Sequence, residues 1–344
     1  GQQVPALAYQ GRNYAINRQN RVDTFMENRT ANKSLSPAIT VVICTHNRAE
    51  LLQKAIQSLV DQDCAQDEFE VLVVDNGSTD NTREVVERFS VVGNIRYLAE
   101  PEIGLCIARN TGWRNARGEY VAYLDDDAIA APCWIASIAR AFSRHSNAGT
   151  VGGRVEPIWE DARPDWLSNE LALGLTIVDW SEHERIIPDI NCEWLVGANM
   201  AMPKSVLDKV GGFHPKLDRV GKNMLSGGDV FLQKQIMELG YDCVYVPQMA
   251  VRHLVMKSRL DQNWFRRRYY WQGISDGVMR LIENDFTPLE RLGMALRAAG
   301  KLIFSPDKLF CLLFSTQNPA RFTTKCFALI QVGQIAALLG ATSS

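Results

Sequence analysis

Residues 38–62, AITVVICTHNRAELLQKAIQSLVDQ, join a nearly continuous run of β-branched residues to a segment whose apolar residues recur at helical spacing. A second buried strand begins soon afterwards in residues 69–80, FEVLVVDNGSTD. Strands that are apolar throughout are typical of a parallel sheet covered on both faces, with helices making the crossovers. The stretch therefore predicts an open α/β sheet that is mostly parallel and flanked by helices.

The same alternation continues beyond residue 80. We expect strands at residues 94–100 and 120–124, and helices at residues 81–89, 104–116 and 133–142. In open α/β sheets, ligands bind at the carboxyl ends of the strands. Polar residues occupy three of these ends, at residues 44–48, 75–80 and 125–127. We therefore expect these three clusters to meet at one edge of the sheet.

Composition places the chain among globular proteins, with 344 residues of which 46% are hydrophobic and 22% charged. A net charge of −2 gives no reason to expect nucleic acid as a partner. The eight cysteines are scattered without zinc-type spacing, and no signal peptide opens the chain, so we expect a cytoplasmic protein with reduced thiols. We predict a flexible arm at residues 1–36, a catalytic domain at residues 37–260 and a helical extension at residues 261–344.

Asp125, Asp126 and Asp127 follow a buried strand directly. A turn that caps the next helix is the simpler explanation, but it needs only one carboxylate. Three neighbouring carboxylates repel one another, and a divalent cation removes this conflict. Because Mg²⁺ and Mn²⁺ prefer oxygen ligands and also bind phosphate, the triplet predicts a site for one of these metals and a diphosphate.

Asp75 ends the second strand, before the polar turn of residues 76–80. The turn and the cap of the next helix explain Gly77 and the residues after it. Asp75 lies outside that explanation, and its carboxylate could accept hydrogen bonds from a nucleobase or a ribose.

Six segments between residues 38 and 254 resemble the family 2 inverting glycosyltransferases, which have a nucleotide-sugar-binding domain of the GT-A type. They are VVICTHNRAELLQKAIQSLVDQ, EVLVVDNGSTDNT, EIGLCIARNTGWRNARGEYVAYLDDDAIAAPCWI, WLVGANMAMPKSVLDKVGGFHPKL, GGDVFLQKQIMELGYDCVYVP and AVRHL. The resemblance implies that a sugar moves from a nucleotide-diphospho-sugar, by preference a UDP-sugar, to a hydroxyl of a glycan, lipid-linked or other acceptor. Such reactions serve polysaccharide or cell-envelope glycan synthesis.

The resemblance also implies roles for individual residues around the donor. Thr45 and Arg48 belong to the nucleotide pocket, and Asp75 meets the nucleobase, with Asn110 beside the nucleotide. Asp125 leans towards the ribose or sugar, and Asp126 shares in donor binding. Asp127 and His253 hold the metal, Mn²⁺ or Mg²⁺. These assignments are expectations for the structure to place.

On the acceptor side, the resemblance makes Asp229 the general base. The family usually has Glu-Asp at this point, whereas this chain has Gly228 before Asp229. Capping of the helix that follows is the structural alternative for Asp229. Trp194, Gly197 and Asn199 would form the wall between donor and acceptor, although Trp194 could equally belong to the core.

Two other classes of protein share some of these features. A nucleotidyltransferase that makes sugar nucleotides should have a glycine-rich basic loop after the first strand, where this chain has CTHNRAE. A non-catalytic carbohydrate-binding protein has no need of Asp229 together with a metal cluster. Both classes are therefore less favoured than a transferase.

The C-terminal part contains residues 263–273, NWFRRRYYWQG, with three arginines among five aromatic residues. This pattern favours an acceptor or a lipid headgroup as partner, and a solvated helix face is the alternative. The apolar runs within residues 301–315 and 326–341 are shorter than the roughly 20 residues of a spanning helix. We expect short helices and peripheral contact with the cytoplasmic face of a membrane. The sequence gives no indication of the oligomeric state.

Overall fold

A computed structural model describes residues 37–219 and 223–341. The flexible arm expected at residues 1–36 lies outside the described residues. The described residues belong to one compact unit.

The first half of the main sheet is parallel. β1 (Ile39–Thr45) lies between β2 (Phe69–Asp75) and β4 (Tyr120–Leu124), and β3 (Ile95–Ala99) forms the edge next to β2. In the register of β1 and β2, Thr45 lies opposite Asp75. The carboxyl ends of β1, β2 and β4 therefore meet at one edge of the sheet, as the sequence predicts.

The second half of the main sheet is mixed. β9 (Asn199–Pro203) runs antiparallel to both of its neighbours, β4 and β6 (Ala148–Gly152). β10 (Asp242–Tyr245) is parallel to β6, and β8 (Arg185–Ile186) closes the sheet as an antiparallel edge strand. The prediction of an open, mostly parallel sheet flanked by helices is confirmed.

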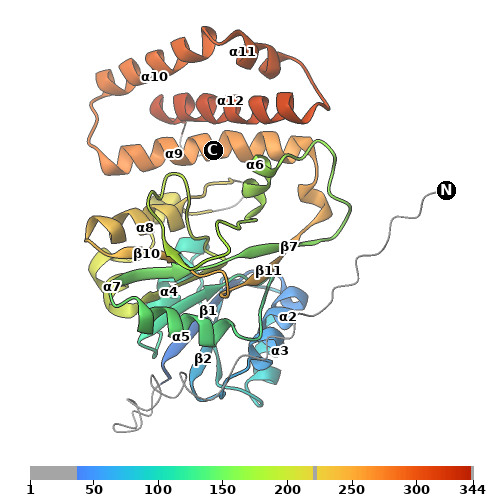
Figure 1. The fold of residues 1–344 in the computed structure, drawn as a ribbon, viewed down its shortest axis with the longest axis vertical. Helices are drawn as coiled ribbons and strands as arrows, with labels where there is room; N and C mark the ends of the chain where they lie inside the picture. Colours follow the sequence, from blue (N-terminus) through green and yellow to red (C-terminus); the bar gives the residue numbers. More distant parts are fainter. Residues whose placement is uncertain (1–36, 220–222, 342–344) are drawn as a thin grey trace, which may run out of the picture. The chain divides into compact units, whose positions relative to one another are not determined.

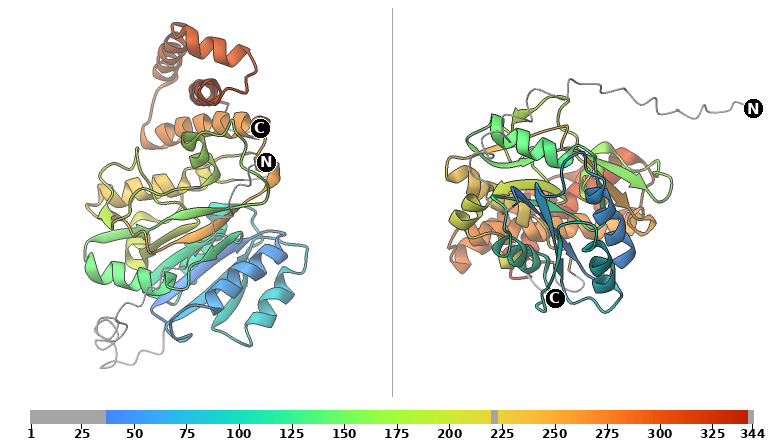
Figure 2. Two further views of the ribbon diagram at one scale, coloured as in Figure 1. Left: turned by 45° about the vertical axis from the view of Figure 1, so that its right-hand side comes forward. Right: turned by 90° about the horizontal axis from the view of Figure 1, so that it is seen from below.

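Helices cover both faces of this sheet (Figures 1 and 2). One face packs against α2 (Ala49–Val60), α3 (Thr82–Phe89) and α5 (Trp134–Arg144). The other face packs against α4 (Leu105–Arg114), α7 (Lys204–Val210) and α8 (Gly228–Glu238). Alternate residues of β1 enter the two cores, because successive side chains of a strand point to opposite faces.

A second, three-stranded sheet contains β5 (Ala128–Ala130), β11 (Val251–Val255) and β7 (Val155–Trp159), with β11 in the centre. β5 follows the aspartate triplet at once and was not predicted, whereas α5 begins at Trp134, within one residue of the start predicted at residue 133. Cys133 is the residue before that helix, and none of the three aspartates caps it. Pairing with β11 explains the strand and puts His253 opposite Ala128.

The C-terminal part consists of α9 (Gln262–Glu283), α10 (Pro288–Ile303), α11 (Pro306–Leu313) and α12 (Pro319–Leu338) (Figure 1). Pro306 begins a new helix, as expected, because proline lacks the N–H that a helix interior needs. α12 is one continuous 20-residue helix rather than a short one, since no proline interrupts it. The remaining short helices are α6 (Asn169–Ala172), η1 (Leu173–Leu175), η2 (Pro215–Leu217) and η3 (Lys257–Arg259). Among the described residues, no helix combines the length and the apolar character needed to cross a membrane.

α9 joins the C-terminal helices to the rest of the unit. Its residues Phe265 and Tyr269 pack with Leu171 and Leu175, and Ile274 and Val278 pack with residues near α8. α12 lies along α9 at very close range, because Gly273 and Gly333 bring the two backbones together (Figure 1). A Cβ atom on Gly333 would overlap the carbonyl oxygen of Tyr270, and one on Gly273 would overlap that of Ile330.

We predict that Gly333→Ala lowers the free energy of unfolding by about 1–3 kcal/mol, because the added methyl group forces α12 away from α9. Gly300→Ala in α10 is the matched control, since a Cβ there meets no atom within 4 Å. That variant should gain about 0.5–1 kcal/mol from the better helix propensity of alanine. Chemical denaturation of both variants measures the difference, and an equal gain in both would contradict close packing of α9 on α12.

Candidate active site

A cleft of about 1200 Å³ opens at the carboxyl ends of the central strands and extends to the C-terminal helices. Thr45, Arg48 and the aspartate triplet line it on the side of the main sheet. Asp229 and residues of α9 and α12 line it as well. The cleft therefore brings together segments that lie up to about 290 residues apart in the chain.

Asp126 points towards the end of β1. Its carboxylate accepts a hydrogen bond from the Thr45 hydroxyl at 2.8 Å and one from Arg48 at 3.0 Å. Arg48 also reaches Asp127 at 3.1 Å. Burial raises the pKa of Asp126 to about 6, against the attraction of the Arg48 charge. Thr45, Arg48 and Asp126, all assigned to the donor from the sequence, are thus in direct contact.

Asp125 and Asp127, from the same turn, lie close to His253. One ligand atom from each of the three side chains lies within 4.8 Å of the others. His253 Nε2 is 3.0 Å from Asp127 Oδ1. Burial alone would raise the pKa of Asp127, but the hydrogen bond with His253 and the charges of Arg48 and Arg259 bring it well below its usual range.

The three residues fit a divalent cation on two grounds. Two carboxylates and an imidazole form a mixed oxygen and nitrogen donor set that suits Mn²⁺ better than Mg²⁺, which prefers oxygen ligands alone. In addition, His253 Nε2 lies 3.0 Å from Asp127 Oδ1, so the ring nitrogen that faces the carboxylates is placed to share a cation with them.

The turns after β1 and β2 hold each other in place. His46 Nδ1 is 2.7 Å from the carbonyl oxygen of Asn76, and Asn47 accepts a hydrogen bond from the backbone N–H of Thr79. Asp75 accepts hydrogen bonds from the N–H of Ser78 at 2.9 Å and the hydroxyl of Tyr97 at 2.8 Å. Asp75 is buried and is absent from the cleft lining, whereas the neighbouring Asn76 is part of it.

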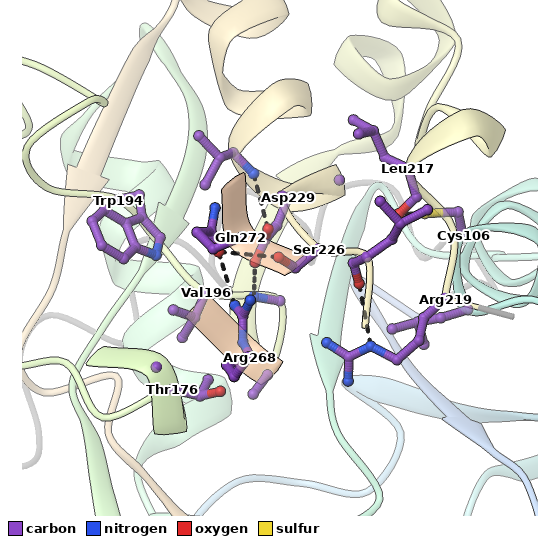
Figure 3. Close-up of a pocket in the computed structure, with 18 of the residues that line it drawn as sticks. Cys106, Thr176, Trp194, Val196, Leu217, Arg219, Ser226, Asp229, Arg268 and Gln272 are labelled. Carbon is purple, nitrogen blue, oxygen red and sulfur yellow. Dashed lines mark hydrogen bonds between the residues drawn. The ribbon is translucent and has the colours of Figure 1, made fainter. Parts of the chain in front are cut away.

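Asp229 lies in the first turn of α8, where Gly227 is the residue that caps the helix. The capping role considered for Asp229 is therefore wrong. One oxygen of Asp229 accepts the backbone N–H of Gly197 at 2.9 Å, which fixes the carboxylate at the cleft wall. Ser226, Gln272 and Arg268 lie around Asp229 in Figure 3.

Arg109 connects the triplet with Asp229, and the sequence analysis did not identify it. The residue is buried, its Nη2 lies 3.2 Å from Asp125, and its guanidinium group lies 5.3 Å from the ring centre of Phe213. A Cβ atom on Gly197 would overlap this guanidinium group. The sequence feature that could have revealed Arg109 is its position, as a charged residue, on the buried face of α4.

Trp194 and Gly197 line the cleft, as expected for a wall, but Asn199 does not. Asn199 is fully buried and holds three groups, namely the indole N–H of Trp134 and the carbonyl oxygens of Arg154 and Met249. These contacts occupy both the oxygen and the nitrogen of its amide. The expectation that Asn199 makes a polar contact with a substrate is therefore corrected. Trp194 is half-buried, and its ring lies 5.4 Å from that of Trp180.

Asn110 is also outside the cleft lining. Its Nδ2 donates to the carbonyl oxygen of Phe213 at 2.8 Å, and its Oδ1 accepts the N–H groups of Phe213 and the Trp113 indole. The side chain therefore ties α4 to the loop after α7. The expectation that Asn110 lies beside the nucleotide is not what its contacts show.

Comparison with known proteins gives a consistent result. The family model described as Glycosyl transferase family 2 matches residues 40–211, which are half of the chain. The chain is 26% identical over 250 residues to the glucosyl-dolichyl phosphate glucuronosyltransferase of Haloferax volcanii, covering 71% of this chain and 78% of that protein. It is 29% identical over 224 residues to glycosyltransferase AglE of the same organism, covering 64% and 68%.

Among solved structures, the mannosyltransferase PcManGT from Pyrobaculum calidifontis, in complex with GDP-Man and Mn²⁺, has a similar fold. The TM-score is 0.56, the sequence identity is 18%, and the match covers 94% of this chain and 95% of that one. The similarity extends over the C-terminal helices as well as the sheet, and it confirms the GT-A type of fold.

We predict that Asn199→Ala lowers the free energy of unfolding by about 2–4 kcal/mol, because three buried polar groups lose their partner at once. Asn94→Ala is the control, since Asn94 is exposed and makes one hydrogen bond, to the carbonyl oxygen of Phe69. Its loss should stay below about 1 kcal/mol. Denaturant titration distinguishes the two, and comparable stabilities would show that Asn199 is not a structural residue.

Proposed function

The chain belongs to glycosyl transferase family 2, and from this premise we propose that it is a metal-dependent, inverting enzyme that uses a UDP-sugar. As a family 2 enzyme it is a glycosyltransferase that takes its sugar from a nucleotide sugar. The two other classes considered from the sequence, a nucleotidyltransferase and a non-catalytic carbohydrate-binding protein, are therefore wrong. The observation that carries the proposal is the cluster of Asp125, Asp127 and His253 in the same cleft as Asp229.

In this proposal, the donor lies along the edge formed by the ends of β1, β2 and β4. Thr45 and Arg48 form the nucleotide pocket with Asp126, supported by their mutual hydrogen bonds. Asp75 recognises the nucleobase, a role that requires an approach to a carboxylate already bonded to Ser78 and Tyr97. Trp194 offers a flat apolar surface to the sugar.

Asp125, Asp127 and His253 would hold Mn²⁺ or Mg²⁺ at the diphosphate. Such a cation supplies Lewis-acid stabilisation for the negative charge that develops on a leaving nucleoside diphosphate. Arg48 and Arg259 add positive charge at the same place, since both are within 4 Å of Asp127. Electrostatic stabilisation of the leaving group by fixed charges of the protein lowers the barrier for breaking the glycosidic bond.

Asp229 would act as the general base. The Gly197 N–H occupies one of its oxygens and holds the carboxylate towards the cleft. The other oxygen accepts the N–H of Val230 at 3.0 Å and retains a lone pair that can take the proton from an acceptor hydroxyl while that hydroxyl attacks the sugar. Attack from the face opposite the leaving group inverts the anomeric centre in one displacement, so no covalent intermediate with the enzyme is involved.

We predict that Asp127→Asn and Asp229→Asn fail in different ways. Asp127→Asn removes a ligand charge and should weaken Mn²⁺-dependent UDP binding by at least about tenfold. Asp229→Asn should leave that binding unchanged and reduce turnover by about 10²- to 10⁴-fold, the usual contribution of a general base. Calorimetry with UDP and Mn²⁺ measures the first effect, and hydrolysis or transfer of a UDP-sugar measures the second.

The control for both is Asp208→Asn, because Asp208 is exposed on α7 and away from the cleft lining. It should behave as the unmodified chain in both assays. Full turnover in excess chelator would disprove that the reaction requires a metal ion. Near-normal turnover of Asp229→Asn would disprove that Asp229 is the general base.

We also propose that the acceptor is lipid-linked and that the enzyme reaches it by peripheral binding to a membrane. The support is the α10–α11 surface, which we define by large apolar side chains that are each at least 39% exposed. They are Leu289, Leu292, Leu296, Ile303, Phe304, Leu309, Phe310, Leu313 and Phe314. Arg297, Lys301 and Lys308 lie on the same two helices. Apolar and aromatic side chains beside basic ones are typical of helices that lie in a membrane interface. One relative in the comparison carries a dolichyl phosphate in its name.

The double variant Phe304→Ser, Leu313→Ser should bind vesicles that contain phosphatidylglycerol at least about tenfold more weakly, because each side chain contributes apolar burial. Val91→Ser with Val92→Ser is the matched control, since both valines are exposed but lie in the loop after α3. Flotation of the full chain with vesicles measures binding. If the unmodified chain stays unbound, or the double variant changes only the oligomeric state, the α10–α11 surface binds protein instead of lipid.

A further inference from the structure

Arg268, from the arginine-rich stretch at the start of α9, enters the cleft without a carboxylate partner. Its Nη2 donates to Gln272 at 3.0 Å, and its Nη1 is buried with no hydrogen-bond partner among the described residues. Gln272 accepts a second hydrogen bond, from Ser226, and donates to Asp276 at 2.9 Å. The glutamine therefore stands between the arginine and the nearest acid on its helix.

Arg219 enters the same cleft from the loop before α8. Its Nε donates to the carbonyl oxygen of Leu225 at 3.3 Å, and Figure 3 shows its guanidinium group on the opposite side of the cleft from Arg268. No ion pair joins either arginine to a carboxylate within the described part of the chain. Burial, followed by the charge of Arg219, lowers the pKa of Arg268 to about 10. The two cations thus repel each other, and Asp229, whose charge attracts both, makes an ion pair with neither of them.

The other cations of the cleft differ in this respect, except Arg280, which makes no ion pair within the described residues but is exposed to water. Arg48 and Arg109 make ion pairs with the aspartate triplet, Arg259 approaches Asp127 at 3.8 Å, and Lys234 pairs with Glu283 at 3.3 Å. Partly buried charges in proteins are normally paired, because the loss of hydration is otherwise uncompensated. Arg219 and Arg268 are therefore the two cations of the described cleft lining whose charge an anionic ligand would compensate best.

An apolar wall lies next to this pair of cations. Leu173 of η1 and Phe327 and Ile330 of α12 line the same cleft, and the Phe327 side chain is 42% exposed. α12 packs in turn on α10 and α11, which carry the α10–α11 surface. The cleft thus offers two guanidinium groups, an apolar wall and a connection to that surface on its C-terminal side.

We propose that Arg268 and Arg219 form an anion subsite that binds the phosphate group of an amphiphilic acceptor, a phosphorylated lipid or glycolipid. The subsite lies on the side of Asp229, and the proposal rests on the proposed function in taking Asp229 as the base. Arginine suits this task because its planar donors match phosphate oxygens. The phosphate would hold the acceptor while its hydroxyl meets Asp229 and its hydrocarbon chain lies along Phe327 and Ile330.

A phosphate could also come from the donor, whose diphosphate we place at the aspartate triplet. The two sources differ in what a variant of Arg268 would do. If the subsite belongs to the acceptor, Arg268→Gln weakens binding of a lipid phosphate and leaves UDP binding intact. If it belongs to the donor, UDP binding itself is weakened.

The experiment uses the full chain and decyl phosphate below its critical micelle concentration, measured by calorimetry with and without UDP and Mn²⁺. Arg268→Gln should bind decyl phosphate about tenfold more weakly or worse, which corresponds to the loss of one charge-assisted hydrogen bond. Arg267→Gln is the matched control, because Arg267 is the exposed neighbour on the same helix and should bind as the unmodified chain does. Decyl glucoside, an uncharged amphiphile, should bind equally to all three proteins.

Arg219→Gln provides a second variant outside the helix, in case Arg268→Gln unfolds, and it should also weaken decyl phosphate binding. Equal binding of decyl phosphate by the unmodified chain and both variants would overturn the proposal, as would a tenfold loss of UDP affinity in Arg268→Gln. Calorimetry with decyl phosphate in the absence of UDP and Mn²⁺ separates a failure of this proposal from a failure of the proposed function. Absence of Mn²⁺-dependent UDP binding in the unmodified chain contradicts that function, whereas decyl phosphate binding still reports on the subsite.

Discussion

The repulsion among three consecutive carboxylates at the end of β4 is the constraint on which the rest of the cleft depends. Asp126 and Asp127 are buried, so water cannot screen them, and each needs a counter-charge or a hydrogen-bond donor. The fold supplies these from three directions, namely Arg48 after β1, Arg109 on α4 and His253 on β11. Because these residues lie on separate elements, the triplet draws both sheets and α4 into one site.

The sequence predicted the parts of this structure that depend on local pattern. Apolar strands and amphipathic helices give periodic signals, so β1, β2, β4 and the helices between them fall close to their expected ranges. The aspartates were visible because three adjacent charges violate the pattern of a buried strand. The residues that meet them at the end of β1 could be expected from the rule on strand ends.

The parts that the sequence missed depend on contacts between distant segments. Asn110 and Asn199 occur within family motifs, yet their amides satisfy backbone groups about 100 and about 45–50 residues away, which no local pattern reveals. Arg109 was missed for the same reason, since its partner Asp125 follows on another element. The contribution of α9 to the cleft likewise depends on how the helix packs against the rest of the protein. From the sequence alone, its arginines were equally compatible with a solvent-exposed helix face. In the folded state, the hydrogen bonds that Asn110 and Asn199 make within the protein therefore identify them as structural residues rather than candidate functional ones.

The close contact of α9 with α12 through Gly273 and Gly333 has a mechanical consequence. Two helices whose backbones are in contact have no layer of side chains between them that could deform, so they move together as one rigid unit. α10 and α11 pack on the side of α12 away from α9 (Figure 1), and residues of α9 and α12 line the cleft. Because no layer of side chains separates α9 from α12, a displacement of α12 would move α9 with it and change the shape of the cleft that both helices line.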